Sequence, residues 1–334
     1  MLIRLQYESS CVTINKKVKG KSKVKGIEII STGRALPKQV VTNDDLGRIV
    51  DTNDEWITTR TGIKTRYKCE DETCISLAIS AAEAALDKAH IDKGEIGAVI
   101  VATTSSEYAF PSVACMVQKE LGLDEEITAF DISSACTGFL HALAVGRALL
   151  GTMKKKYVLL VGSERMSSLL DYTDRTTCVL FGDGAGAAII GASDKMYYQK
   201  SWARGNDEVL YCLGAGQSPA FLSMKGNDVF RFAVTVLKQA VDEVLNEAGM
   251  TMDDIDYCVC HQANIRIIQH VQKQFAGNEH KFFANIDKYG NTSAASIPIA
   301  IDELMEAGKL KSGMKVICVG FGAGLTWSSV LFEL

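Results

Sequence analysis

Three residues of types used in nucleophilic catalysis lie far apart in this chain of 334 residues. Cys136 stands in a turn of small residues (SSACTG), His261 directly follows the apolar run Tyr257–Cys260, and Asn291 lies in a Gly-Asn-Thr-Ser segment. A thiolate attacks electrophilic carbon, an imidazole transfers protons or donates hydrogen bonds, and a carboxamide donates hydrogen bonds without adding charge. Cys136 is therefore a candidate nucleophile.

The segments around Cys136 predict a junction between a strand and a buried helix. Ile127–Ile132 is an apolar run typical of a buried strand, and Phe139–Leu150 is apolar almost all round, as in a buried helix. Unpaired backbone N–H groups and the positive end of the helix dipole meet at Cys136, and both favour a thiolate over a thiol. A cysteine that only fills core space is the alternative, because the chain holds ten cysteines.

The other two residues also have structural interpretations. A histidine at a strand end is often a satisfied structural residue, and an asparagine such as Asn291 commonly caps a helix. Near the C-terminus, the glycines of Val319–Trp327 (VGFGAGLTW) either let backbone amides approach a substrate or form an ordinary turn. Each signal is weak alone, so the arrangement of the elements has to decide.

The composition indicates a globular protein with a large core, with 47% hydrophobic and 23% charged residues. The net charge of −4 implies no general attraction to nucleic acid. No apolar run reaches the roughly 18 residues that span a bilayer. Most cysteines lie in apolar runs, which favours free thiols over disulfides. We expect a cytoplasmic protein with no membrane or nucleic-acid partner.

Residues 1–25 differ from the rest, because seven basic residues stand there against Glu8. Subtracting this local charge of +6 from −4 leaves −10 on the remainder. The lysines follow no helical or strand period, so we expect a disordered extension. A transit peptide is the weaker alternative, since lysine rather than arginine dominates.

Strands and helices alternate from Gly26 onward, and the second half repeats the order of the first. A long helix and a strand (Cys74–Ala89, then Ile96–Thr103) correspond to Phe230–Ala248 and Tyr257–Cys260. The helix after Cys136 and the strand Lys156–Gly162 correspond to a helix that opens at Gly290 and the strand Lys315–Val319. We predict an α/β fold of two duplicated halves, 26–195 and 196–334. Ligand sites form beyond the carboxyl ends of parallel strands, so Cys136, His261 and Asn291 are expected to meet.

Two further patterns bear on cofactors. Gly182–Gly186 (GDGAG) lacks the Lys-Ser/Thr of a P-loop and the spacing of a dinucleotide fingerprint, so we interpret it as tight backbone packing. Cys258 and Cys260 point the same way from a strand, but no second ligand pair follows at zinc-like spacing. We expect no metal and no other cofactor.

Six segments carry a resemblance to a known family: DEWITTRTGI at 54–63, SSACTGF at 133–139, FGDGAGA at 181–187, HQANIR at 261–266, GNTS at 290–293 and GAGLTW at 322–327. From about Gly26 to Leu334 the chain resembles β-ketoacyl-acyl-carrier-protein synthase III, a family of thiolase-fold condensing enzymes. The resemblance implies a thiolase-like, five-layer αβαβα architecture and a homodimer. It also implies the initiating condensation of type II fatty acid biosynthesis, an acyltransferase reaction.

In the implied reaction, Cys136 accepts an acyl group from acyl-CoA, which is a substrate and not a cofactor. The backbone N–H groups of Cys136 and Ala323 form the oxyanion hole, where alanine serves in place of the family's frequent glycine because the donor is backbone. Malonyl-acyl-carrier protein loses CO2, and neutral His261 and Asn291 donate hydrogen bonds to the enolate. Its carbon attacks the acyl-cysteine, giving a β-ketoacyl-acyl-carrier protein; CoA and CO2 are the other products.

The resemblance also implies three sets of binding residues. The coenzyme A set, with Trp56 and Arg175 on either side of the adenine, is Thr52, Trp56, Arg60, Arg175 and Asn264. The acyl pocket, to which the partner subunit supplies the first residue, is Phe110, Met166, Phe181 and Phe321. The docking surface for the acidic carrier protein is Arg231, Gln262, Ala263, Asn264, Ile265, Arg266 and Lys273, although Lys273 is also consistent with an ordinary solvated face.

Other enzyme classes fit less well. Papain-like proteases share the Cys-His-Asn order but have a different signature and fold. Degradative thiolases need a second catalytic cysteine, and Cys318 lies inside a predicted strand. Another thiolase-fold condensing enzyme, of starter-unit or polyketide type, is the alternative function. Ser328 stands where glycine is frequent, and residues 196–223 differ from the family, so the length and branching of the primer stay open.

Overall fold

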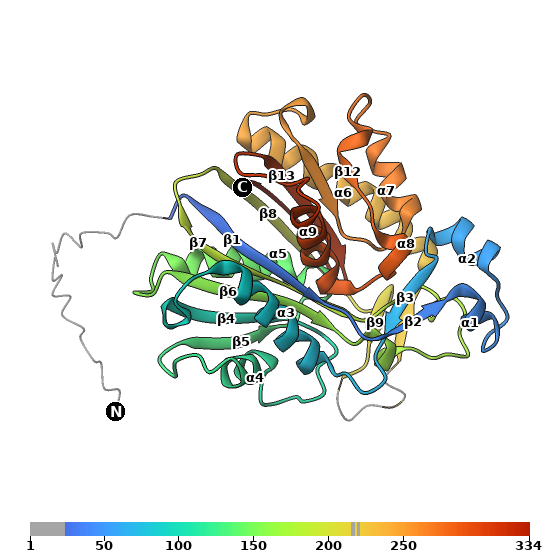
Figure 1. Ribbon diagram of the computed structural model, residues 1–334. Helices are drawn as coiled ribbons and strands as arrows, with labels where there is room; N and C mark the ends of the chain where they lie inside the picture. Colours follow the sequence, from blue (N-terminus) through green and yellow to red (C-terminus); the bar gives the residue numbers. More distant parts are fainter. Residues whose placement is uncertain (1–23, 215–217, 219–220) are drawn as a thin grey trace, which may run out of the picture.

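The computed structural model describes residues 24–214, 218 and 221–334 (Figure 1). Nearly all of the predicted N-terminal extension, residues 1–23, lies outside the described residues. Within the described part, two five-stranded sheets form the framework. The first has the strand order β1 (Gly26–Ala35), β7 (Gly184–Ser193), β6 (Tyr157–Glu164), β4 (Ile96–Ala102) and β5 (Thr128–Ile132).

The second sheet repeats this topology. In matching order its strands are β8 (Tyr197–Asn206), β14 (Gly324–Glu333), β13 (Lys315–Gly322), β11 (Tyr257–Cys260) and β12 (Phe282–Phe283). In both sheets the first three strands pair antiparallel and the last three parallel. The predicted duplication is confirmed, and the predicted boundary at 195/196 falls between β7 and β8.

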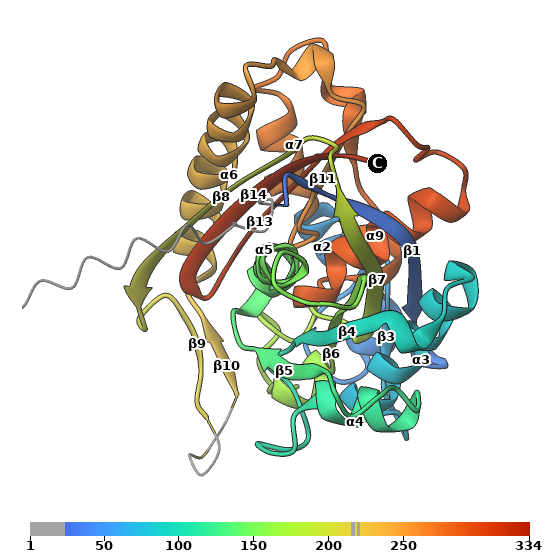
Figure 2. The ribbon, with the colours of Figure 1, turned by 90° about the vertical axis from the view of Figure 1, so that its left-hand side faces the viewer.

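Helices fill three layers around the two sheets (Figure 2). α3 (Cys74–Ala89) and α4 (Val113–Glu120) pack on the outer face of the first sheet. α6 (Gly226–Ala248) and α7 (Ile265–Gln272) cover the outer face of the second. α5 (Gly138–Leu150) and α9 (Ser296–Glu306) lie between the sheets. The order of layers is the expected αβαβα.

The central layer explains the sequence of α5. Phe139, Leu140 and Leu143 are at most 1% exposed and share one apolar cluster with residues of α9 and of both sheets. A helix between two sheets has little contact with water, so it is apolar on most of its surface. Strand β4 is buried on both faces for the same reason: Ile100 faces the central layer, and Val99 and Val101 face α3 and α4.

The glycine-rich segment at the start of β7 packs tightly, as predicted. A Cβ on Gly186 would lie 2.7 Å from the backbone nitrogen of Ile299 in α9, so only glycine lets the helix approach this closely. Most of the cysteines are buried and form no disulfide, as the following free thiols show: Cys69, Cys74, Cys178, Cys258, Cys260 and Cys318.

Shorter elements complete the described part. They are β2 (Gln39–Thr42), α1 (Asn43–Gly47), α2 (Asp54–Thr61), β3 (Thr65–Lys68), β9 (Leu210–Cys212), β10 (Leu222–Met224) and α8 (Ile286–Tyr289). The strands β9 and β10 pair with each other and were not predicted. Among the described residues, every helix is too short or too polar to cross a bilayer.

One boundary differs from the expectation in an informative way. The helix expected to open at Gly290 begins at Ser296, after a 3₁₀ turn over Ser293–Ala295. The Asn291 side chain accepts a hydrogen bond from the Ser293 N–H at 2.9 Å, which holds the chain in a tight turn before the helix starts.

Candidate active site

Cys136 lies in a strained turn at the start of α5. A 3₁₀ turn over Ala135–Thr137 joins β5 to the helix, and Ala135 has a φ of 44°, in the left-handed region that residues other than glycine rarely adopt. The hydroxyl of Thr137 donates to Ser134 O at 2.8 Å and pairs with the hydroxyl of Thr326 at 2.8 Å. These bonds tie the Cys136 turn to the second half of the chain.

The end of β13 passes directly against this turn. A Cβ on Gly322 would lie 2.8 Å from the Cys136 backbone nitrogen, so glycine is required for the approach. The next residue, Ala323, lines the same cavity as Cys136. Cys136 and Ala323, the two residues predicted to supply the oxyanion hole, therefore line the same cavity.

His261 extends the β11–β13 pairing by one residue, with its N–H donating to Val319 O at 2.8 Å. Its ring is 1% exposed, stands edge-on to Phe321, and pairs through Nδ1 with the hydroxyl of Ser296 at 2.7 Å. Burial lowers the pKa of His261 to about 3, so the imidazole is neutral at physiological pH. The bond to Ser296 leaves Nε2 as the nitrogen for a substrate.

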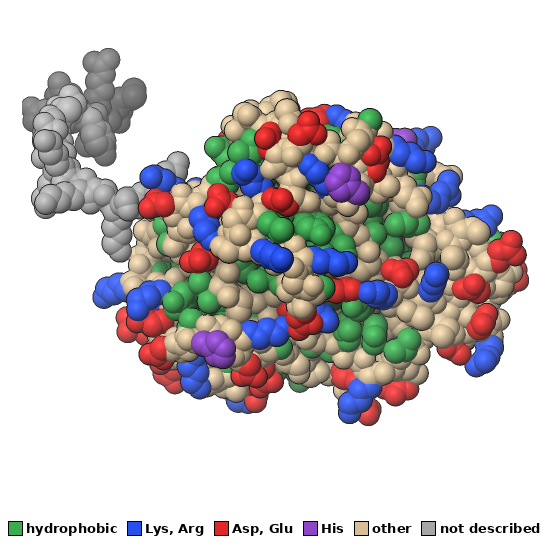
Figure 3. Space-filling view, turned by 45° about the horizontal axis from the view of Figure 1, so that its top comes forward, with side chains coloured by type: hydrophobic (Ala, Val, Ile, Leu, Met, Phe, Trp, Pro, Cys, Tyr) green, Lys and Arg blue, Asp and Glu red, His purple; other side chains and the backbone are tan. Residues whose placement is uncertain are grey.

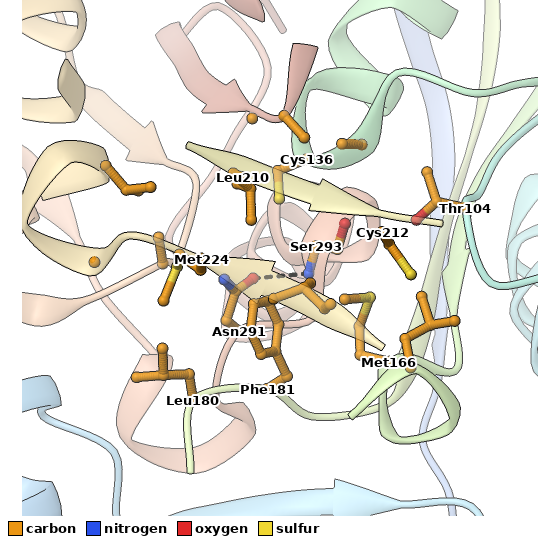
Figure 4. Close-up of a pocket in the computed structure, with 18 of the residues that line it drawn as sticks. Thr104, Cys136, Met166, Leu180, Phe181, Leu210, Cys212, Met224, Asn291 and Ser293 are labelled. Carbon is orange, nitrogen blue, oxygen red and sulfur yellow. Dashed lines mark hydrogen bonds between the residues drawn. The ribbon is translucent and has the colours of Figure 1, made fainter. Parts of the chain in front are cut away.

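Asn291 is fixed through both its backbone and its side chain. Its N–H donates to Leu180 O at 2.9 Å, and its carbonyl accepts from Gly182 N at 3.1 Å. Oδ1 accepts from Ser293 N, the bond drawn in Figure 4. Because Oδ1 is occupied by a donor, the amide is oriented and Nδ2 is the group left to donate to a ligand.

Cys136, His261 and Asn291 line one cavity of about 1020 Å³. In Figure 4 the Cys136 sulfur points toward Asn291 and Ser293. The predicted acyl-pocket residues Met166, Phe181 and Phe321 are buried and line the same cavity. The structure therefore brings the predicted triad and most of the predicted acyl pocket together.

The expectation that this turn favours a thiolate is wrong for the ligand-free protein. Burial raises the pKa of the Cys136 thiol to about 12, the nearby Glu164 carboxylate acts in the same direction, and the Ser293 hydroxyl only partly opposes them. Loss of solvation outweighs the favourable backbone groups, so the resting side chain is a neutral thiol.

The sequence did not single out the β9–β10 hairpin, which lines the same cavity as the triad. Leu210, Cys212 and Met224 come from its two strands and lie around the cavity in Figure 4. Each strand has three residues, too few for an alternating pattern to predict it. Residues 215–217 and 219–220, which lie between the two strands in the sequence, are outside the described residues.

Two further groups at the site were also missed. Glu164 is fully buried at the end of β6, and Ser296 holds His261. A Ser-Glu pair at the end of a predicted parallel strand, Ser163-Glu164, was the available signal for the carboxylate, because that end of the sheet carries the site.

Three of the predicted coenzyme A residues, Trp56, Arg60 and Asn264, line the outer part of the cavity. The Arg60 guanidinium lies 4.6 Å from the Trp56 ring centroid, and Asn264 Nδ2 donates to Arg60 O at 3.1 Å. Thr52 does not line the cavity, and its hydroxyl is buried without a hydrogen-bond partner among the described residues.

Arg175 also lies over Trp56, with its guanidinium carbon 5.3 Å from the ring centroid. For an aromatic base to stack between the guanidinium and the indole, the two groups must lie about 7 Å apart, which is two stacking distances of ~3.5 Å. Arg175 Nη1 donates to Asp51 O at 2.8 Å and to its carboxylate at 3.2 Å. The arginine therefore has to move outward before it can cover an adenine.

The predicted carrier-binding residues fall into different environments. Arg231, Arg266 and Lys273 are exposed, and Arg231 pairs with Asp228. Gln262 is 1% exposed. Its Nε2 donates to Cys260 O and Phe283 O, and its Oε1 accepts from Asn285 N, so the side chain is not available for surface contact. Two other members, Ala263 and Asn264, line the cavity, whereas Ile265 packs against Gly62.

Phe110, predicted to reach the acyl pocket of a partner subunit, is 86% exposed and does not line the cavity of its own chain. No group of three or more His, Cys, Asp or Glu side chains in the described ranges is arranged to hold a metal ion.

Comparisons with known proteins match this geometry. Residues 130–203 match the family model of 3-oxoacyl-[acyl-carrier-protein (ACP)] synthase III, and residues 245–334 match the model of its C-terminal part. A beta-ketoacyl-[acyl-carrier-protein] synthase III of Clostridium acetobutylicum is 44% identical over 321 residues, covering 92% of this chain and 98% of the relative. The chain belongs to the β-ketoacyl-acyl-carrier-protein synthase III family. Membership makes it an acyl-transferring condensing enzyme with a thiolase-like fold.

Solved structures agree with this assignment. The crystal structure of 3-oxoacyl-[acyl-carrier-protein] synthase III from Aquifex aeolicus is 42% identical, covers 92% of this chain and 100% of its own, and has a TM-score of 0.88. The priming beta-ketosynthase of the R1128 polyketide pathway is 33% identical, with coverages of 93% and 97% and a TM-score of 0.85.

The buried environment of His261 makes a testable prediction. In a histidine-labelled sample, the NMR signals of His261 should not titrate between pH 5 and 8, because burial lowers its pKa to about 3. The unfolded histidine has a pKa near 6.5. The unfolded state thus binds more protons below that value, and this residue reduces stability as the pH falls toward 3. The exposed His280 is the internal control. A His261 midpoint near 6.5 would contradict the assigned burial.

Proposed function

We propose that this chain transfers an acyl group from acyl-CoA to Cys136 and then condenses it with malonyl-acyl-carrier protein, releasing CO2. The product is a β-ketoacyl-acyl-carrier protein, the first condensation of type II fatty acid synthesis. The observation that carries the proposal is the meeting of Cys136, His261 and Asn291 in one cavity of a synthase III family member.

In the first half-reaction, Cys136 Sγ attacks the thioester carbon of acyl-CoA and CoA leaves as a thiolate. The thioester oxygen becomes an oxyanion, which the backbone N–H groups of Cys136 and Ala323 stabilise. Both residues line the cavity, and Gly322 lets the end of β13 approach the Cys136 turn closely. Pre-positioned backbone donors stabilise this charge strongly, because they need no reorganisation during the reaction.

In the second half-reaction, malonyl-acyl-carrier protein loses CO2 and forms an enolate. His261 Nε2–H and Asn291 Nδ2–H donate hydrogen bonds to the enolate oxygen. Burial keeps His261 neutral, and the Ser293 N–H orients the Asn291 amide, so both present donors without a formal charge. A carboxylate at position 291 would repel the enolate. The enolate carbon then attacks the acyl group, and the Cys136 thiolate leaves.

The cavity suits an acyl chain at its inner end and coenzyme A at its mouth. Met166, Phe181 and Phe321 supply apolar surface beside Cys136. Trp56 and Arg60 lie at the outer end, where an indole and a guanidinium stack on a nucleotide base. Adenine binding requires Arg175 to swing away from Trp56 and close again over the base.

The carrier protein, an acidic partner, docks on Arg231 and Arg266 beside the cavity mouth. Arg266 lines the cavity and lies over the Phe230 ring at 5.8 Å. Figure 3 shows Lys and Arg side chains interspersed with Asp and Glu over the face it presents. On a surface of mixed charge, recognition depends on a small local group of cations.

The proposal includes a homodimer in the cytoplasm. The exposed aromatic side chains of Phe110 (86% exposed) and Tyr108 (54% exposed) suit insertion into a second subunit. Buried thiols such as Cys258, Cys260 and Cys318, none in a disulfide, suit a reducing compartment. A polyketide-type priming synthase is the second candidate function, favoured by the likeness to the R1128 enzyme. Rates over a panel of acyl-CoA primers distinguish the two.

The two half-reactions should separate by mutation. Cys136→Ala is expected to abolish acyl transfer from acyl-CoA, since it removes the nucleophile. His261→Ala should instead slow malonyl decarboxylation by ~10²–10³-fold, the usual effect of losing a donor to an oxyanion. Cys115→Ala and His280→Ala, both at exposed positions, are the matched controls. Acyl transfer by the Cys136→Ala protein at the normal rate would refute the assignment.

The docking site should respond to charge reversal. Replacing Arg231 and Arg266 together by glutamate should raise KM for malonyl-acyl-carrier protein about tenfold and leave KM for acyl-CoA nearly unchanged. The effect should shrink at high salt, because exposed charges are screened. Lys119→Glu, on α4 at the outer face of the first sheet, is the control. Unchanged KM for the carrier substrate would exclude this surface.

A further inference from the structure

Glu164 is a buried carboxylate for which the proposed reaction gives no role. It ends β6, is 0% exposed, and forms no ion pair with Lys or Arg in the described part of the chain. Its Oε2 accepts from Ser105 Oγ at 2.5 Å and from Thr104 N at 3.1 Å. Ser105 Oγ in turn accepts from Arg165 N at 2.7 Å, so the carboxylate is fixed within the first half of the chain. Burying a carboxylate without a cation is costly, and a role that uses both of its oxygens explains its presence.

The other carboxylate oxygen holds the turn that precedes α9 in the second half. Ser293 Oγ donates to Glu164 Oε1 at 3.0 Å. This turn lies directly on β6, because a Cβ on Gly162 would lie 2.5 Å from the carbonyl oxygen of Ala294. Glu164 therefore joins the first half of the chain to Ser293, a residue of the second half that lines the cavity.

Ser293 also orients the side chain of Asn291. Its N–H donates to Asn291 Oδ1 at 2.9 Å, which leaves Nδ2 as the group that donates to a ligand (Figure 4). Ser293 has a φ of 48°, a value that residues other than glycine rarely adopt, so its contacts have to hold it there. Without an acceptor for its hydroxyl, the Ser293 backbone is free to relax toward negative φ, which moves its N–H away from Asn291 Oδ1.

We propose that Glu164 is a positioning residue for the decarboxylation half-reaction, which acts through Ser293 to keep the Asn291 carboxamide oriented toward the enolate. Two hydrogen bonds carry this effect, from the Ser293 hydroxyl to Glu164 and from the Ser293 N–H to Asn291. The inference rests on the proposed function, in which Asn291 Nδ2–H donates to the enolate oxygen. Glu164 and Ser293 exchange no proton with the substrate in this role.

This role predicts different effects on the two half-reactions. A donor that is misplaced by ~1 Å loses up to about 100-fold in rate, so decarboxylation should slow when the anchor of Asn291 is removed. Acylation uses Cys136 and backbone donors but not Asn291. The Glu164 carboxylate also raises the pKa of the Cys136 thiol, so its removal does not disfavour the thiolate. Slow decarboxylation with unimpaired acylation is a combination that general damage to the fold does not produce.

The test is single-turnover kinetics of the full-length protein in two stages. Acylation is measured by mass spectrometry of the quenched protein after mixing with acyl-CoA. The acylated protein is then mixed with malonyl-acyl-carrier protein that is radiolabelled at the malonyl carboxylate, and the release of CO2 is followed. Glu164→Ala and Ser293→Ala should each release CO2 about 10- to 100-fold more slowly than the wild type. Both should acylate at close to the wild-type rate.

Two further variants test the connection between the residues. Glu164→Gln keeps one oxygen for Thr104 N and can donate from Nε2 to Ser293 Oγ, so it should recover most of the CO2 release that Glu164→Ala loses. Because Glu164 acts through Ser293, the double variant Glu164→Ala/Ser293→Ala should be no slower than the slower single variant. Independent effects would multiply instead.

Glu107→Gln and Ser31→Ala are the matched controls. Glu107 is a carboxylate that accepts from Cys74 N at the start of α3, and Ser31 is a buried serine of β1 that donates to Ala85 O. Both variants should release CO2 at the wild-type rate. If Glu164→Ala does not fold, Ser293→Ala decides alone, because it leaves the carboxylate and its first-half partners in place.

Four results would overturn the positioning role: CO2 release at the wild-type rate in the alanine variants, an equal loss of acylation, losses that multiply in the double variant, or no recovery in Glu164→Gln. A wild-type protein that neither becomes acylated nor releases CO2 would overturn the proposed function itself.

Discussion

The close packing of two turns at the start of the central helices is the constraint on which the site depends. The turn Ala135–Thr137 precedes α5, and the turn Ser293–Ala295 precedes α9. Each contains a residue with positive φ, Ala135 and Ser293, which the surrounding contacts hold in place. The duplication brings the two helices side by side between the sheets, so the nucleophile from one half meets the hydrogen-bond donors from the other.

Loss of solvation then dominates the pKa values of the two titratable members of the triad, His261 and Cys136. The same exclusion of water keeps His261 neutral, which suits a donor to an enolate, and raises the pKa of the Cys136 thiol to about 12. A helix N-terminus does not overcome this cost. Ser293 links the buried groups of the site, because its hydroxyl donates to Glu164 and its N–H donates to Asn291 Oδ1.

Much of the fold and the triad was predictable from the sequence because the signals were local or repeated. The apolar strand, small-residue turn and apolar helix around Cys136 predicted its position, and the repeated order of helices and strands predicted the duplication. The hairpin of Leu210–Cys212 and Leu222–Met224 was not predictable, since such short strands carry no period. The protonation state of Cys136 was mispredicted, because its pKa depends on burial and on Glu164. Only the folded chain brings Glu164 near the Cys136 turn.

The central claim is that Cys136 holds the acyl group between the two half-reactions. Peptide mapping by tandem mass spectrometry after incubation with acetyl-CoA or a longer acyl-CoA tests it most directly. One acyl group should appear on the peptide that contains Cys136 and should disappear, with formation of the β-ketoacyl product, when malonyl-acyl-carrier protein is added. An acyl group on another cysteine such as the exposed Cys115, or product formation without acylation of Cys136, would contradict the account.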